Sequence, residues 1–262
     1  MGGGDDRICA RTGLLLQSGS GRRVSRIAQS RFGALNPPQR PVQGPRDGWG
    51  RWDVPGHRTV YAAEDEVAAF SEVINYIEPR LPSIPMADLF DDVSAVDSET
   101  LDAQIYSELP THGSMPVRSI SKGWRDARSS YTLSLPAAGW FVDVTASASV
   151  AIIGQALESP LQKCGVDQLT LGEITGSLDK DVTTTIASWL HGAVLDDGSL
   201  PHGITYRSKW GAEWRTWAIW LREMDAGLES TEEPTKSLMQ DSIGAHSRPL
   251  IEAAILRNMR VY

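Results

Sequence analysis

The stretch GRWDVPGHRTVYAAEDEVAAFSEVINYI, residues 50–77, holds the pattern on which the fold prediction rests. Within it, Thr59–Ala62 predicts a buried strand. Glu64 or Asp65 can then begin a helix that runs to about Ile77, because apolar residues recur there at helical spacing. A strand followed at once by an amphipathic helix is the unit around which we arrange the other segments.

Two arginines precede this strand and helix in the sequence. Arg51 stands in Gly50-Arg51-Trp52 after a long loop, and Arg26 lies in or beside a first short strand, Val24–Ile27. An arginine presents a rigid fork of donors that matches phosphate. A salt bridge at the surface is the commoner role for any single arginine, but the positions of these two favour binding of an anion.

Glu72 lies in the middle of an otherwise apolar helix, where a carboxylate is costly unless it is paired or exposed. One interpretation is a solvated outer face, and the residues alone favour it. The other is a buried carboxylate that faces Arg26 or Arg51 across a cleft. Such a group could bind ribose hydroxyls and stabilise positive charge at a sugar carbon, as in glycosidases.

Two further side chains are candidates for the same cleft. Tyr61 closes the strand and is either a core tyrosine, which the residues favour, or an aromatic face on which a ligand stacks. Ser208 ends a predicted strand, Gly203–Ser208, and no nucleophile elbow surrounds it, which argues against a serine hydrolase. No glycine-rich phosphate loop of either common type occurs, which argues against Rossmann and P-loop folds.

The remaining segments predict one domain of the α+β class, with helices packed around a small mixed sheet. Residues 1–21 predict a flexible N-terminal extension, and residues 22–262 a single domain with a helical insertion near 79–127. The proline-rich residues 36–47 predict an irregular loop between the two arginines. We expect this loop to form one wall of the cleft entrance and to be covered by a protein partner.

The C-terminal part is rich in tryptophan. Trp210, Trp214, Trp217 and Trp220 recur at i, i+4, i+7 and i+10, which predicts one face of a helix. We expect this face to be core, with a partner interface as the alternative. Upstream, the strands 130–135 and 140–145 suggest a hairpin, and downstream residues 228–248 suggest a polar linker.

Composition excludes several classes of protein. The chain of 262 residues carries a net charge of -8 and no long basic stretch, so we expect no direct binding of nucleic acid. Neither Cys9 nor Cys164 has a metal-like spacing, and we expect no metal. No apolar run approaches the roughly 20 residues that span a bilayer. A cytoplasmic protein without membrane contact is the expectation.

The order and spacing of these residues resemble the RES-domain family, NAD-degrading toxins of Xre–RES type toxin–antitoxin systems, over about residues 22–210. The resemblance rests on Arg26, Gly50-Arg51-Trp52, Tyr61, Glu72 and His202–Ser208. It implies an ADP-ribosyltransferase-like fold that binds NAD and cleaves its nicotinamide–ribose bond by hydrolysis or phosphorolysis. It also implies an Xre-type antitoxin as partner, while a homodimer stays open.

The resemblance assigns roles to the candidate residues. Arg26 and Arg51 would contact pyrophosphate or ribose, Tyr61 would stack, and Glu72 would assist cleavage. Ser208 would orient NAD. The chain departs from the family pattern at Asp53, where asparagine is commoner, at His202, where aspartate is commoner, and at Lys209, where arginine is commoner.

Two alternatives share this pocket. One is a non-catalytic interaction protein that kept the fold, and the other is an ADP-ribosyltransferase that acts on a macromolecule. Whether water, phosphate or a macromolecule accepts the ADP-ribose is left open by the residues.

Overall fold

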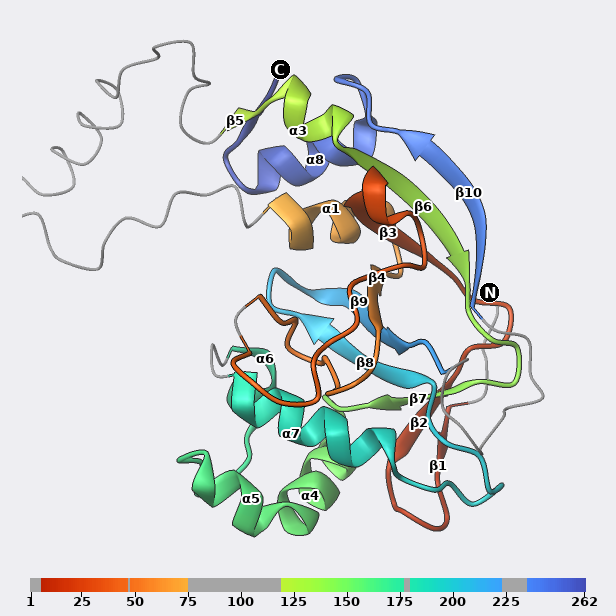
Figure 1. Cartoon of the computed structure of the whole chain (residues 1–262), viewed down its shortest axis with the longest axis vertical. Helices are drawn as coiled ribbons and strands as arrows, with labels where there is room; N and C mark the ends of the chain where they lie inside the picture. The colour runs from red at the N-terminus through yellow and green to blue at the C-terminus, as the bar shows by residue number, and fades with distance from the viewer. Residues whose placement is uncertain (1–5, 47, 75–118, 177–179, 223–234) are drawn as a thin grey trace, which may run out of the picture.

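The computed structural model describes residues 6–46, 48–74, 119–176, 180–222 and 235–262. Its framework is a nine-stranded mixed sheet (Figure 1). In spatial order the strands are β1 (Arg7–Ile8), β2 (Leu15–Ser18), β7 (Trp140–Asp143), β8 (Gly203–Ser208), β9 (Gly211–Trp220), β4 (Thr59–Ala63), β3 (Arg23–Gln29), β6 (Arg128–Ser134) and β10 (Lys236–Ser242). Neighbouring strands are antiparallel, except for the parallel pair β7–β8.

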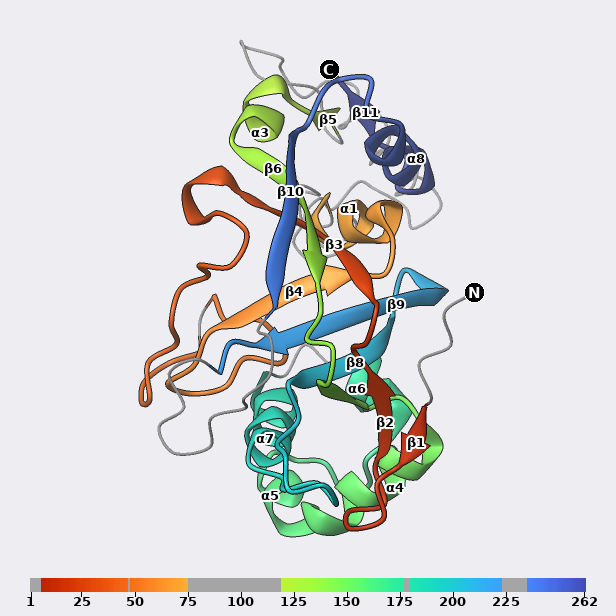
Figure 2. The same cartoon turned by 90° about the vertical axis from the view of Figure 1, so that its right-hand side faces the viewer.

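The helices gather in two groups at opposite ends of the molecule, as both views show (Figures 1 and 2). One group is α1 (Glu66–Ile74), α3 (Lys122–Asp126) and α8 (Arg248–Leu256), and the other is α4 (Ser147–Ala156), α5 (Glu158–Lys163), α6 (Leu171–Thr175) and α7 (Lys180–His191). The parallel pair β5 (Ser119–Ile120) and β11 (Arg260–Val261) and the 3-10 turn η1 (Ser30–Phe32) complete the described elements. The predicted α+β class is confirmed.

Each group of helices closes a hydrophobic core against the sheet. Leu16, Val142 and Ile204, from β2, β7 and β8, share a cluster with Ile153 of α4 and Ile186 of α7. All five side chains are fully buried. Burial of one such side chain stabilises the fold by about 1.5–3 kcal/mol. A second core, which includes Phe70 and Leu250, joins α1 to α8.

Trp214, Trp217 and Trp220 lie on strand β9 and Trp210 lies in the turn before it, so the predicted helical face is wrong. β9 is held by antiparallel ladders to β8 and to β4, and only two residues separate it from β8. Because side chains alternate along a strand, Trp217 packs edge-on against Phe141, with ring centroids 5.0 Å apart. Trp220 joins the core on the other side, where its indole donates to the Trp52 carbonyl at 3.1 Å. The predicted burial in the core holds for both.

The N-terminal segment is part of the sheet, so the predicted flexible extension is wrong for residues 6–21. β1 pairs with β2, and β2 pairs with β7. Cys9, Leu14 and Leu16 are fully buried. These strands are too short to show a hydrophobic period, which is why the sequence pattern missed them.

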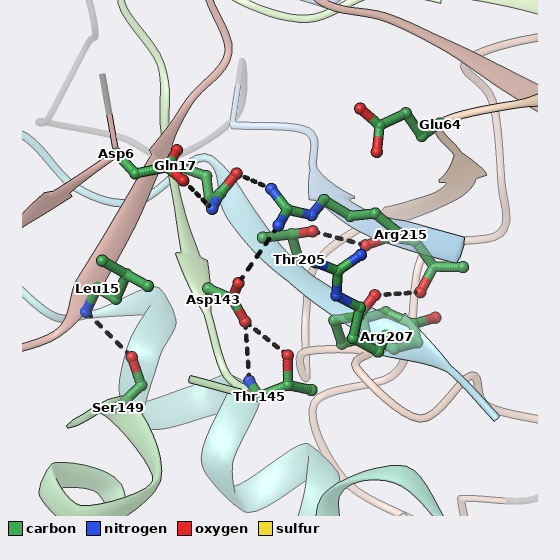
Figure 3. Close-up of polar contacts among 12 residues, drawn as sticks. Asp6, Leu15, Gln17, Glu64, Asp143, Thr145, Ser149, Thr205, Arg207 and Arg215 are labelled. Atoms are coloured by element: carbon green, nitrogen blue, oxygen red, sulfur yellow. Dashed lines mark hydrogen bonds and ion pairs between the residues drawn. The ribbon is translucent and has the colours of Figure 1, made fainter. Parts of the chain in front are cut away.

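A polar network ties this N-terminal segment to the middle of the sheet (Figure 3). The Gln17 side chain donates to Asp6 at 2.8 Å and accepts a hydrogen bond from Arg215 of β9. Arg215 also lies 3.9 Å from the carboxylate of Asp143 on β7. Because Gln17 is 1% exposed, its amide is satisfied inside the protein, and the network links β2, β7 and β9.

Two other predictions differ from the structure, and a third falls largely outside the described residues. Part of the predicted linker 228–248 is strand β10, which pairs with β6, and residues 228–234 lie outside the described residues. Every residue of β10 is exposed, so no alternation marked it as a strand. The predicted hairpin is wrong, because β6 pairs with β3 and β10 whereas β7 pairs with β2 and β8. Of the predicted insertion near 79–127, only residues 119–127 are described, and they form β5 and α3.

Two histidines are held neutral by their surroundings. His191 packs against His57 and Trp220, with ring centroids 4.1 and 5.3 Å away. Burial, with Arg222 and His57 as lesser causes, lowers the pKa of His191 from its ordinary 6.5 to about 3. Burial, followed by Arg222, likewise lowers the pKa of His202 to about 4. Both groups therefore bind protons more readily in the unfolded chain.

We expect the free energy of unfolding to decrease as the pH falls from about 6.5 to about 4. In that range both histidines become protonated in the unfolded chain, while in the folded protein they stay largely neutral. Urea denaturation at pH 7.5, 6.0, 5.0 and 4.5 measures the slope. In a His191→Phe variant the slope should be smaller, and an unchanged slope would contradict this assignment.

No helix in the described parts of the chain is long and apolar enough to cross a membrane.

Candidate active site

A cavity of about 310 Å³ lies where β3, β4 and α1 meet the end of the β8–β9 hairpin. Four of the five predicted site residues line it, namely Arg26, Arg51, Tyr61 and Glu72. The fifth, Ser208, lies behind Glu72 and is hydrogen bonded to it. The structure thus brings together residues that are up to 182 positions apart in the sequence (208 − 26).

Arg26 enters the cavity where a strand ladder stops. β3 and β4 pair only at Ser25 and Ala63. Beyond that bridge, Nη1 of Arg26 donates to the Tyr61 carbonyl at 3.2 Å. Its buried Nε has no hydrogen-bond partner, and no described carboxylate forms an ion pair with it. Burial lowers the pKa of Arg26 to about 10, so the guanidinium is charged at neutral pH and suits an anionic ligand.

Glu72 faces the cavity, not bulk solvent, so the interpretation of a solvated outer face is wrong. The Ser208 hydroxyl donates to its carboxylate at 2.6 Å, and the Trp210 amide donates to the same hydroxyl at 3.0 Å. Burial raises the pKa of Glu72, while the bond from Ser208 and then the nearby charges of Arg51, Lys209 and Arg257 oppose the rise. The pair Ser208–Trp210 therefore fixes the direction of the carboxylate.

Ser208 itself is not among the cavity-lining residues. The predicted direct role in orienting NAD therefore has no support in its position. Its contact with Glu72 makes it a support for that carboxylate.

Arg51 lines the cavity, but its guanidinium is partly used elsewhere. It donates to the carbonyls of Ile174 and Thr175, the latter at 2.9 Å, at the end of α6. These carbonyls carry the partial negative charge of a helix C-terminus. The buried Nε has no hydrogen-bond partner. Arg51 is thus anchored by α6 and keeps one donor unused.

Tyr61 has a hydroxyl that is satisfied inside the protein, and it is also among the cavity-lining residues. Its hydroxyl donates to Asp53 at 2.8 Å and accepts from the Trp52 amide at 2.9 Å. Burial, followed by the charge of Asp53, raises the pKa of Tyr61 well above its ordinary value. A Cβ on Gly50 would come within 2.3 Å of that hydroxyl. The close approach of the Tyr61 ring therefore requires glycine at position 50.

Tyr206 and Lys209 are among the cavity-lining residues that were not predicted. Alternation along Gly203–Ser208 places Tyr206 on the same face as Ser208, a signal that could have identified it. The centre of the Tyr206 ring lies 6.0 Å from the Arg51 guanidinium. Lys209 follows the strand in the hairpin turn, where no periodicity applies.

The proline-rich loop does not form the predicted wall. Its described residues, 36–46, have no regular structure, as expected, but none of them lines the cavity. The loop lies behind the site instead. Arg40 donates to the buried carboxylate of Asp53 at 2.5 Å, and Asp53 in turn contacts Tyr61.

No group of three or more His, Cys, Asp or Glu side chains within the described residues could hold a metal ion.

Comparisons with known proteins identify a family and one similar solved structure. Residues 23–153 match the RES domain family, and this stretch includes Arg26, Arg51, Tyr61 and Glu72. No curated protein matches the chain in sequence. Among solved structures, a chain in the crystal structure of the M. tuberculosis MbcT–MbcA toxin–antitoxin complex is similar at 14% identity. The likeness has a TM-score of 0.46 and covers 91% of this chain and 88% of that chain.

Proposed function

The chain belongs to the RES domain family, and on that premise we propose that it cleaves the bond between nicotinamide and ribose in NAD. In this proposal it is the toxin component of a toxin–antitoxin pair. The observation that carries the proposal is the meeting of Arg26, Arg51 and Glu72 at one cavity. Two guanidiniums and one supported carboxylate match a ligand with anionic phosphates and a sugar carbon that becomes positive.

The positive charges around the cavity support the binding of NAD. The buried guanidinium of Arg26 has no ion-pair partner among the described residues, so a phosphate of NAD would supply the missing anion. Lys209 is also among the cavity-lining residues and adds positive charge near the site. The rings of Tyr61 and Tyr206 offer flat surfaces to nicotinamide or ribose. NAD is in this account a substrate, consumed in the reaction.

Cleavage needs only one carboxylate. The nicotinamide ring of NAD is cationic, so it leaves as a neutral base with the electron pair of the broken bond. No proton has to be delivered to it, whereas glycosidases use a second carboxyl group for that purpose. Positive charge then develops on C1′ of the ribose. Glu72, the one carboxylate among the described cavity-lining residues, stabilises that charge.

The acceptor completes the reaction. Water that attacks C1′ and loses a proton to solvent yields ADP-ribose, and phosphate yields ADP-ribose phosphorylated at C1′. Purified protein incubated with NAD, with and without inorganic phosphate, distinguishes these outcomes when the products are followed by ³¹P NMR. ADP-ribose attached to protein would indicate a transferase instead. Unconverted NAD would contradict the proposal and favour a non-catalytic interaction protein.

An antitoxin partner is the second part of the proposal. A toxin that depletes NAD has to be restrained, and the family resemblance implies an Xre-type protein. Residues 41–45 of the proline-rich loop are exposed, and Val42 is 74% exposed. The same loop reaches Asp53 through Arg40. A protein bound to this loop would therefore contact a segment that supports the site.

We expect growth arrest when the chain is expressed alone in bacteria, because NAD would be lost faster than it is made. Cellular NAD measured after induction checks this, with a Glu72→Gln variant at equal protein level as the control. The variant culture should grow and keep its NAD. Healthy growth with normal NAD in cells that express the unaltered chain would contradict the toxin function.

A further inference from the structure

Asp53 is a buried carboxylate with three donors around it. It is 1% exposed, and it does not line the cavity. Its Oδ2 accepts from Nε of Arg40 at 2.5 Å and from the Gly50 amide at 2.7 Å. Its Oδ1 accepts from the Tyr61 hydroxyl at 2.8 Å. All three neighbouring groups donate to Asp53, which suits an ionised carboxylate because it only accepts hydrogen bonds.

Tyr61 is held at both ends by this arrangement. Its backbone belongs to β4, and its hydroxyl is fixed between Asp53 and the Trp52 amide. Backbone of Gly50 lies against the ring, with no room for a Cβ. The hydroxyl is therefore used in the interior, and the ring is what Tyr61 presents to the cavity.

The donor pattern favours aspartate over asparagine at position 53. If an asparagine turned its NH₂ toward the Gly50 amide and Arg40, it would meet two other donors. If it turned the NH₂ toward the Tyr61 hydroxyl, that hydroxyl would have to accept and would lose the acceptor for its own proton. The negative charge of Asp53 is balanced by Arg40, which belongs to the proline-rich loop. In this chain the loop is thereby connected to the ring of Tyr61 through two successive hydrogen bonds.

We infer that Asp53 is a positioning residue for the substrate, which acts by holding the ring of Tyr61 in the cavity. The inference rests on the proposed function for the identity of the substrate. Asp53 touches no reacting atom. Its loss should therefore weaken substrate binding and leave the chemistry of Glu72 largely intact.

Steady-state kinetics with NAD test this in four variants. Asp53→Ala, Tyr61→Ala and the double variant should each raise KM by about 10–100-fold, with kcat changed by less than about 3-fold. The double variant should be no worse than the poorer single variant, because both changes remove the same ring position. Gln39→Ala is the matched control, since it removes a loop hydrogen bond to Gly56 without touching Asp53.

Circular dichroism confirms which variants are folded, and Asp53→Asn replaces Asp53→Ala if the latter is not. The asparagine variant should show an intermediate KM, because one of its two oxygens is lost. The inference would be overturned if the KM increases of the two single variants multiplied in the double variant. An unchanged KM in a folded single variant would also overturn it.

A second readout does not depend on turnover. Protein labelled with 3-fluorotyrosine gives a ¹⁹F resonance for Tyr61, which is assigned by its disappearance in Tyr61→Phe. In Asp53→Asn this resonance should shift or broaden, whereas Gln39→Ala should leave it in place. An unmoved resonance would overturn the inference. If the unaltered protein neither binds nor cleaves NAD, the proposed function fails, and the ¹⁹F result alone decides whether Asp53 positions the ring.

Discussion

A Glu72→Gln variant is expected to lose about 10²–10³-fold in kcat for NAD cleavage, the loss seen when one electrostatic stabiliser is removed from an active site. Glutamine has almost the size of glutamate and can still accept the hydrogen bond from Ser208. It lacks the negative charge that faces C1′ of the ribose in the proposed reaction. Nicotinamide release at saturating NAD measures the effect, and KM should change little.

The matched control is Glu252→Gln, which removes an exposed carboxylate from α8. It should retain full activity. Because burial raises the pKa of Glu72, the variant should also be at least as stable as the unaltered protein near neutral pH. If the Glu72→Gln variant turned over NAD as fast as the unaltered protein, Glu72 would not be a catalytic residue.

An Arg26→Met variant is expected to lose affinity for the substrate without losing stability. A hydrogen bond to a charged group contributes about 1.5–3 kcal/mol, so ADP-ribose should bind about 10–100-fold more weakly. The fold, in contrast, is relieved of a buried cation that no described carboxylate neutralises, and methionine fills a similar volume. Calorimetric titration with ADP-ribose and a thermal unfolding curve measure the two effects separately.

Arg23→Met serves as the control on the same strand, because Arg23 is exposed. It should alter neither affinity nor melting temperature appreciably. If Arg26→Met binds ADP-ribose normally and melts much earlier, Arg26 is a structural residue and the anion site lies elsewhere.

The elements that the sequence predicted well are those with a complete local pattern. β8 spans Gly203–Ser208 as expected, and β4 and α1 lie where the strand from Thr59 and the helix after it were predicted. β1, β2 and β10 were not predicted, because short or fully exposed strands show no alternation of apolar and polar residues. β9 failed because its tryptophans fall at spacings that a helix also allows, and only the ladders to β8 and β4 decide the matter.

The candidate site also has a part that the sequence predicted and a part that it did not. The positions of Arg26, Arg51, Tyr61 and Glu72 around one cavity agree with the expectation drawn from the family resemblance. Their partners depend on tertiary contacts that no local pattern encodes. The bond from Ser208 to Glu72 joins residues 136 positions apart, and Arg51 meets Thr175 across 124 positions. The support of Tyr61 by Asp53 is local, yet only the folded loop reveals it.

The single bridge between Ser25 and Ala63 has a mechanical consequence. It is the only described ladder contact between the three strands β3, β6 and β10 and the six strands on the other side. Arg26 belongs to the first set, and Tyr61 belongs to the second. A dinucleotide bound to both residues would connect two parts of the sheet that are otherwise joined by a single backbone bridge. Ligand binding and resistance to unfolding would then increase together, and the amides along β4 would become the most sensitive reporters of an occupied cavity.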